Sequence, residues 1–167
     1  VVEFTDRFRE TAIPDLSEYW DRQTGRITSN TGQLVWDYSE QGFITADSPA
    51  FQGVVGFASG RDHELGDLTI TTETPFAVIL VTSLEKERNL ADSEQILVTT
   101  VARARNTGME YSRDRKELLR VGEAPILLEP VDLTLKLRRG GDPVVYQLDH
   151  AGRRTGTNIP VSGGVVQ

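Results

Sequence analysis

Short runs of β-branched and aromatic residues recur along most of this chain, and clusters of turn residues separate them. Runs of this kind spaced roughly 8–12 residues apart are typical of an all-β sandwich or barrel, and no long run has the period of a helix. The sequence therefore predicts an all-β fold, a jelly-roll-like antiparallel β-sandwich of about eight to ten strands. The expected strands are residues 33–37, 42–47, 51–58, 68–72, 76–82, 95–104, 126–129, 131–137 and 143–148.

Turn signals and side-chain alternation predict how some of these strands pair. A turn containing glycine predicts a hairpin between 33–37 and 42–47, and another predicts a hairpin between 131–137 and 143–148. Residues 131–137 alternate between apolar and polar, so one face of that strand should lie in the core and the other in water.

The first 26 residues differ from this pattern. Proline and acidic residues followed by Gly25 predict a short helix at about 14–23. We therefore expect residues 1–26 to form an N-terminal extension whose helix packs on the sandwich, and residues 27–167 to form the β-sandwich domain. The residues that would share the apolar face of the helix are Leu16, Tyr19 and Trp20.

One strand is apolar without interruption, from Phe76 to Val81. Continuous apolar runs are typical of strands that are covered on both faces, so this strand is expected to be central. The residues expected in the core are Phe57, Phe76, Val78, Leu80, Leu133 and Leu135.

Charge and composition exclude several classes of function. The net charge is −7, with 25 acidic and 18 basic residues, which argues against nucleic acids and anionic membranes as partners because both require clustered cations. The chain has no cysteine, so it has no disulfide, thiolate nucleophile or cysteine-based zinc site. No apolar stretch approaches the roughly 20 residues of a membrane span. The chain begins without an initiator methionine, as an excised module would, so the lack of a signal peptide does not argue against secretion.

No catalytic motif is present. His63 and His150 both fall in predicted turns and would have to converge to bind a metal, whereas solvated loop histidines are the commoner case. Ser59 and Asp67 near His63 have no supporting pattern for a catalytic triad, and among 25 acidic residues some pair will meet a glycosidase spacing by chance. We predict no catalytic residue, metal ligand or cofactor. Loop carboxylates leave room for a structural Ca²⁺, but no ligand spacing identifies one.

Surface aromatics are the best lead to a binding function, because a sugar ring packs its apolar face on an aromatic side chain while nearby polar groups bind its hydroxyls. Tyr111 lies in a long polar segment with Arg113 and Asp114, and this group is the first candidate for a glycan site. Trp20 with Asp21 is the second. The competing interpretations are that Tyr111 anchors its own loop and that Trp20 docks the helix.

Trp36 is predicted to be a core residue instead. In an extended strand it shares a face with Leu34, and burial of so large a side chain stabilises a fold by a few kcal/mol.

Several segments resemble one family of proteins. Residues 29–60 read SNTGQLVWDYSEQGFITADSPAFQGVVGFASG, which is similar to the pattern SDTGELxWD…GxxTVDTPRTQxxxGF in the C-terminal β-sandwich regions of large bacterial glycoside hydrolases. The likeness continues through VTTVARARNTGM at 98–109 and GEAPILLEPV at 122–131, and covers roughly residues 27–155 in order. It departs at 50–52, where Ala-Phe-Gln replaces the expected Arg-Thr-Gln. The resemblance implies a module of an extracellular, polysaccharide-degrading enzyme and carries no catalytic residue.

Three functions follow as hypotheses. The first is a non-catalytic carbohydrate-binding module of a secreted glycoside hydrolase, with a polysaccharide or oligosaccharide and the parent catalytic domain as partners. The second is a purely structural β-sandwich that packs on a catalytic barrel without binding sugar, and it predicts an exposed apolar patch on the isolated chain. The third, a jelly-roll lyase or hydrolase, needs basic residues and a histidine lining a cleft, and the strands supply few.

Overall fold

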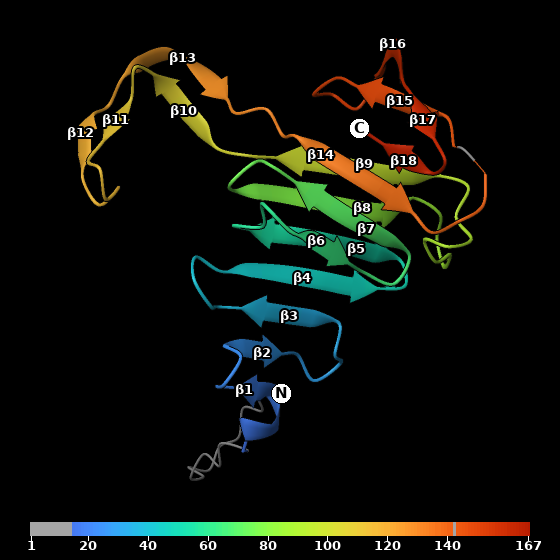
Figure 1. Cartoon of the computed structure of the whole chain (residues 1–167). Coiled ribbons are helices and arrows are strands. Elements are labelled where there is room, and N and C mark those ends of the chain that lie inside the picture. The colour runs from blue at the N-terminus through green and yellow to red at the C-terminus, as the bar shows by residue number, and fades with distance from the viewer. Residues whose placement is uncertain (1–14, 142) are drawn as a thin grey trace, which may run out of the picture.

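The structure is a computed structural model that describes residues 15–141 and 143–167. The described chain is built of antiparallel strands, which form a seven-stranded sheet, a five-stranded sheet and three two-stranded ribbons (Figure 1). The expectation of an all-β, antiparallel fold is therefore confirmed. The only helix in the described residues is a single 3-10 turn, η1, at Ser17–Tyr19.

The larger sheet has the order β1-β2-β3-β4-β5-β8-β9. Its strands are β1 (Trp20–Asp21), β2 (Arg26–Thr28), β3 (Leu34–Asp37), β4 (Phe43–Ser48), β5 (Phe51–Gly56), β8 (Ala77–Ser83) and β9 (Ile96–Val101). The second sheet has the order β17-β18-β14-β7-β6. Its strands are β6 (Asp62–Glu64), β7 (Leu68–Thr72), β14 (Leu133–Leu137), β17 (Val161–Ser162) and β18 (Val165–Val166).

Three ribbons complete the described structure. They pair β10 (Ala104–Thr107) with β13 (Glu123–Leu128), β11 (Glu110–Tyr111) with β12 (Leu118–Arg120), and β15 (Val145–Leu148) with β16 (Arg154–Ile159).

The hydrophobic core lies between strands β5 and β8 of the larger sheet and strands β7 and β14 of the smaller one. Alternate residues of β7 and β8 are buried, as expected where a sheet has one covered face. The buried core residues from these four strands are Val54, Ala77, Ile79, Val81, Leu68, Ile70 and Leu135. Leu133 packs against the same cluster and is partly buried, so the predicted orientation of β14 is confirmed.

The predicted register of β8 is wrong. Ile79 is fully buried, whereas Val78 and Leu80 lie on the opposite face and are only half-buried. Phe57 and Phe76 are also half-buried and make an edge-to-face contact with 5.3 Å between ring centroids. The uninterrupted apolar run therefore does not reflect a strand covered on both faces, because among the described residues only one face of β8 is fully buried.

The helix predicted at about 14–23 is also wrong over its described part. After η1 the chain turns extended, and Trp20 and Asp21 pair with Ile27 and Arg26. The Asp21 carboxylate accepts hydrogen bonds from the backbone N–H groups of Gln23 and Thr24 at 2.9 and 3.1 Å, which forms a turn that competes with a helix. The first strands therefore continue the same sheet as the rest of the domain.

One of the two predicted hairpins is confirmed. Strands β3 and β4 pair from Leu34↔Ala46 to Asp37↔Phe43. Strand β14 instead pairs with β7 and β18, while β15 pairs with β16, so the hairpin expected between 131–137 and 143–148 is wrong.

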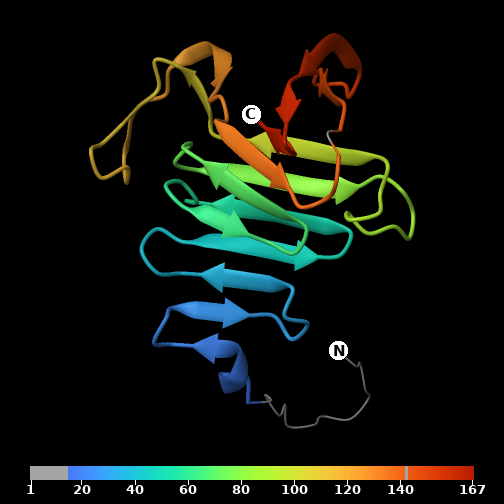
Figure 2. The same cartoon turned by 45° about the vertical axis from the view of Figure 1, so that its right-hand side comes forward.

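Residues 104–128 form an arm that extends away from both large sheets (Figures 1 and 2). It consists of the ribbons β10–β13 and β11–β12, and none of its residues belongs to the core. At its base the Arg103 guanidinium donates two hydrogen bonds to the Glu129 carboxylate, at 2.6 and 2.8 Å. All six residues of β13 are exposed. A two-stranded ribbon of this kind is marginally stable by itself in water.

The outer edge of β9 is open. Because Leu84 donates its backbone N–H to the Gln95 carbonyl oxygen, antiparallel alternation directs the N–H and C=O groups of Ile96, Val98 and Thr100 away from β8. Within the described residues β9 pairs with β8 alone. The other terminal strands are short or charged, as exposed sheet edges usually are, whereas β9 has six residues and no charged side chain.

Asp37, on the core side of β3, is a buried carboxylate whose pKa links stability to pH. Burial raises the pKa of its carboxyl, but hydrogen bonds from Ser39 and Arg26 outweigh that effect, so the pKa lies below its usual value. A carboxyl with a lowered folded-state pKa stabilises the fold above its unfolded pKa of about 3.9, and this stability is lost as pH falls through the folded value.

Asp37→Asn is therefore expected to lower the free energy of unfolding at pH 7 by about 1–3 kcal/mol, as loss of a charged hydrogen-bond acceptor typically does. Urea denaturation at pH values from 7 down to 3 measures the effect. The difference between the variant and the original chain should shrink below about pH 4; a constant difference over the whole range would contradict the assignment.

Candidate functional site: the outer face of the seven-stranded sheet

The face of the seven-stranded sheet that is turned away from the core is apolar across its whole width. We call it the outer face. The strand register aligns one side chain from every strand in a single row on this face. The row consists of Trp20, Ile27, Trp36, Ile44, Val55, Val78 and Val101.

None of the described strand residues on the outer face is charged, in a chain whose residues are 26% charged. A sheet face in contact with water normally alternates apolar inside with polar outside, so this face lacks the composition of a solvent face. Besides the row, its strand residues are Leu34, Ala46, Ser48, Phe51, Gly53, Leu80, Thr82, Leu97 and Thr99.

Strands β1 to β3 have their polar residues on the core side of the sheet and most of their apolar residues on the outer face, the reverse of the usual arrangement. Their polar residues lie on the face that continues the core side, where Arg26 donates to the buried Asp37 at 3.1 Å. Their apolar residues lie on the outer face and remain exposed: Leu34 by 50% and Trp36 by 48%. The prediction that Trp36 is a core residue is wrong, because the face it shares with Leu34 is the uncovered one.

Three aromatic side chains meet at the β1–β3 end of the outer face. The Trp20 indole Nε1–H donates a hydrogen bond of 2.7 Å to the Tyr38 hydroxyl. The Tyr38 ring packs edge-on against Trp36, with 5.7 Å between centroids. The Arg22 guanidinium lies 4.1 Å from the centroid of the Trp20 ring. We call Trp20, Tyr38, Trp36 and Arg22 the aromatic cluster.

The first sequence-predicted site, around Tyr111, lies on the arm. Tyr111 is 41% exposed, and the Arg105 guanidinium sits 5.5 Å from its ring centroid. Asp114 accepts a 2.6 Å hydrogen bond from the Ser112 hydroxyl, which closes the turn that also contains the exposed Arg113. Asp114 is thus part of the turn structure, and the arrangement agrees with the interpretation that this group shapes its own loop.

The second predicted pair is separated by its own hydrogen bonds. Trp20 joins the aromatic cluster, whereas Asp21 points its carboxylate into the following turn, where it also accepts a 2.6 Å hydrogen bond from the Thr24 hydroxyl. Hydrogen bonds from Thr24 lower the pKa of Asp21, and those from Ser112 and Lys116 lower the pKa of Asp114. Both carboxylates are therefore ionised turn residues at neutral pH.

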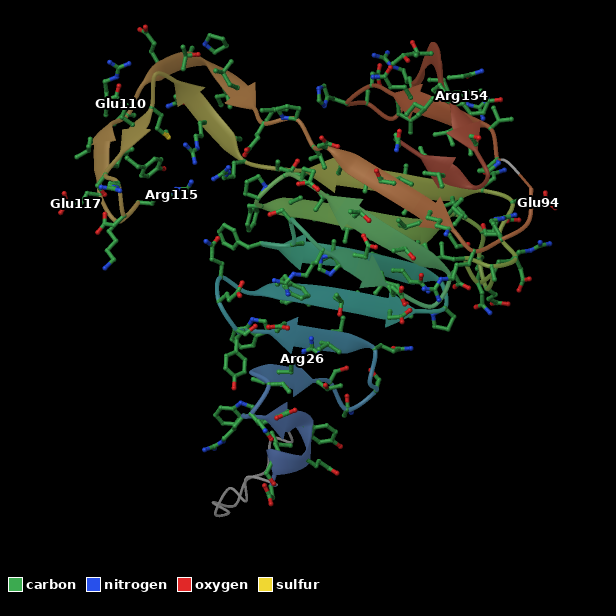
Figure 3. All side chains as sticks on the ribbon, viewed as in Figure 1. Arg26, Glu94, Glu110, Arg115, Glu117 and Arg154 are labelled. Atoms are coloured by element: carbon green, nitrogen blue, oxygen red, sulfur yellow. The ribbon has the colours of Figure 1, made fainter. Side chains whose placement is uncertain are left out.

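The two predicted sites lie far apart. Figure 3 shows Arg26 on the sheet near the N-terminal strands, and Glu110, Arg115 and Glu117 on the arm at the opposite end of the described molecule. One glycan subsite cannot combine Trp20 with Tyr111.

Neither histidine has a catalytic setting. His63 is buried, its Nε2 is 2.8 Å from the Ala58 carbonyl oxygen, and its ring packs on Phe43. His150 is exposed in a turn. The described residues contain no group of three His, Cys, Asp or Glu side chains that could hold a metal ion. In that same part of the chain, no helix has the length and hydropathy of a membrane span.

Comparisons with protein-family models, curated proteins and solved structures found no match to this chain.

Tyr38 and Arg22 were not identified as site residues from the sequence. Both become neighbours of Trp20 only because residues 20–28 form strands β1 and β2. The signal for that hairpin was the turn Asp21-Arg22-Gln23-Thr24-Gly25, in which Gly25 has a φ of 72°, a conformation that favours glycine.

Proposed function

We propose that this chain is a non-catalytic accessory module that packs part of its outer face against a neighbouring folded domain. The observation that carries the proposal is the uncharged outer face, whose aliphatic side chains are exposed or half-buried among the described residues. The part concerned, which we call the aliphatic half, belongs to β4, β5, β8 and β9. Its main side chains are Ile44, Val55, Val78, Leu80, Leu97 and Val101.

The size of the aliphatic half favours a tethered domain over a second copy of the chain. Four strands spaced about 4.8 Å apart and about five residues long cover on the order of 300 Å², or about 600 Å² when both surfaces are counted. Interfaces between domains of one polypeptide begin at about 600 Å², whereas stable associations of separate proteins bury about 1,200 Å² or more. A linker supplies the missing affinity as effective concentration.

The resemblance to C-terminal regions of large bacterial glycoside hydrolases gives the identity of the neighbour that we propose. It is the catalytic domain of a secreted, polysaccharide-degrading enzyme, and the module works outside the cell. The arm, which begins three residues after Val101, provides further exposed apolar side chains for such a contact. Ile126 and Leu128 of the arm are 65% and 61% exposed.

We further propose that the fold belongs with the β-sandwiches and is related to the jelly rolls. Two antiparallel sheets contribute residues to one core, and the chain crosses between them after β5, after β7, and again between β9 and β14. These features support the class, while the short ribbons and the arm are additions to it.

Substitution of Ile44 and Val101 by lysine tests the proposed contact. Both side chains are exposed, by 41% and 53%, so the double variant should fold with a free energy of unfolding within about 0.5 kcal/mol of the original. The double variant should also bind less of a hydrophobic dye than the original chain does. In the polypeptide that joins this module to the neighbouring domain, hydrogen exchange of β8 and β9 should be slower than in the isolated module, and the double variant should abolish the difference.

The matched control places lysine at Val144 and Leu148, which are exposed by 65% and 39% near and within β15, outside the outer face. This variant should leave the exchange protection intact. Equal exchange of β8 and β9 in the isolated and the joined module would refute the docking proposal.

A further inference from the structure

We propose that the aromatic cluster is a binding platform for an extended neutral polysaccharide. The proposal concerns the β1–β3 end of the outer face and does not depend on docking through the aliphatic half. Trp36 is 48% exposed and Trp20 is 43% exposed. Yet Trp20 is held by the Tyr38 hydroxyl, and Trp36 by the edge of the Tyr38 ring. The rings are therefore both accessible and oriented before any ligand arrives.

The spacing of the two indoles fits a chain of sugars. Trp20 and Trp36 lie on the same row with Ile27 between them, so their positions are two strand spacings apart, roughly 9.5 Å. That distance is comparable to the length of a disaccharide unit in an extended polysaccharide. A chain that crosses the strands along the row would place alternate sugar rings on the two tryptophans and the ring between them over the half-buried Ile27.

Polar groups beside the rings match the hydroxyls of a sugar. The Arg22 guanidinium, stacked 4.1 Å from the Trp20 ring centroid, has donors directed in a fixed plane. The Tyr38 hydroxyl accepts from Trp20 and can donate outward. The Trp36 indole N–H has no hydrogen-bond partner among the described residues. Aromatic planes bordered by a few polar groups are the usual composition of a sugar subsite.

Charge selects among polysaccharides. The chain carries a net charge of −7, and the only charged side chain of the cluster is Arg22. Strongly anionic polymers are repelled by such a protein, whereas neutral chains of equatorially linked pyranoses present flat apolar ring faces and no charge. Phe51 and the edge-to-face pair of Phe57 and Phe76, beside the aliphatic half, are all half-buried. Trp20 and Trp36 are exposed, so the tryptophan end of the outer face is the ligand site.

The fluorescence of the chain itself reports on this site, because Trp20 and Trp36 are its two tryptophans. Titration with xylan, glucomannan, mixed-linkage β-glucan and agarose, with alginate as the anionic control, should shift or quench the emission with at least one neutral polymer. Native gels containing the same polymers should show retardation by that polymer.

Variants separate this site from other exposed aromatics. Trp36→Ala should weaken retardation at least tenfold with an unchanged melting temperature, because the side chain lies outside the core. Tyr38→Phe removes the hydroxyl that accepts a hydrogen bond from Trp20. It should weaken retardation less than Trp36→Ala does. The control Tyr146→Ala removes a 40% exposed tyrosine in the β15–β16 ribbon, whose ring centroid also has a guanidinium 3.8 Å away, that of Arg154 (labelled in Figure 3). It should bind as the original does, and so should Tyr111→Ala.

Absence of retardation and of any emission change with every polymer would overturn the proposal. So would equal retardation of Trp36→Ala and the original chain, or a loss of binding in Tyr111→Ala alone. These results are distinguishable from failure of the docking proposal, which is measured by hydrogen exchange in the variants with lysine at Ile44 and Val101.

Discussion

Replacement of Ile79 by alanine is expected to lower the free energy of unfolding by about 2–5 kcal/mol, because a fully buried side chain is lost and a cavity remains. Ile79 has no exposed surface and belongs to the cluster shared by the two large sheets. Urea denaturation followed by circular dichroism gives the midpoint and slope from which the change is calculated.

The neighbouring variant Val78→Ala is the control for strand register. Val78 points to the outer face and is half-buried, so its truncation should cost clearly less than that of Ile79. Equal costs at the two positions would mean that both faces of β8 are covered in the isolated chain, which would also remove the basis for the outer face as a contact surface.

Gly53→Ala is expected to cost about 1–3 kcal/mol, in the range of other substitutions that overfill a packed site. Gly53 lies in β5 opposite Leu80 of β8. A β-carbon there would overlap the Ile79 carbonyl oxygen and come within 3.0 Å of the Leu80 side chain. The clash is with backbone, so it cannot be relieved by a rotamer change and must displace β5 from β8. Thermal or urea unfolding measures the loss.

The same substitution at Gly140 is the matched control. A β-carbon at that position has no atom within 4 Å, and alanine restricts the unfolded chain more than glycine does. Gly140→Ala should therefore be neutral or slightly stabilising. A Gly53→Ala protein as stable as the Gly140→Ala protein would show that β5 and β8 are less closely apposed than the structure has them.

Alternation of apolar and polar residues was sufficient to predict the buried face of strands whose two faces differ in polarity. Strand β14 alternates between apolar and polar, and its Leu135 is buried as expected. The same rule could not orient β8, because Val78 and Leu80 are as apolar as Ile79 and Val81. Which set is buried depends on where the second sheet lies, and that is decided by the pairing of β7 with β14, residues about 60 positions apart.

The aromatic cluster could not be predicted from the sequence, because residues 16–25 are compatible with both a helix and a strand–turn–strand structure. Leu16, Tyr19 and Trp20 have helical spacing, but the Asp21 carboxylate forms a turn, and pairing with β2 and β3 favours the extended form. Trp36 was assigned to the core because apolar faces are usually covered within the same domain. That rule fails in β1 to β3, where the polar face is the one directed to the core side.

The open edge of β9 has a consequence for handling this protein. Its sequence, Ile96-Leu97-Val98-Thr99-Thr100-Val101, is β-branched at most positions and has neither charge nor proline, which is the composition of segments that stack into cross-β fibrils. Three pairs of backbone donors and acceptors face outward along it. At high concentration or during slow refolding, this segment rather than the apolar outer face sets the template for ordered aggregation, because only an edge strand can extend a hydrogen-bonded ladder.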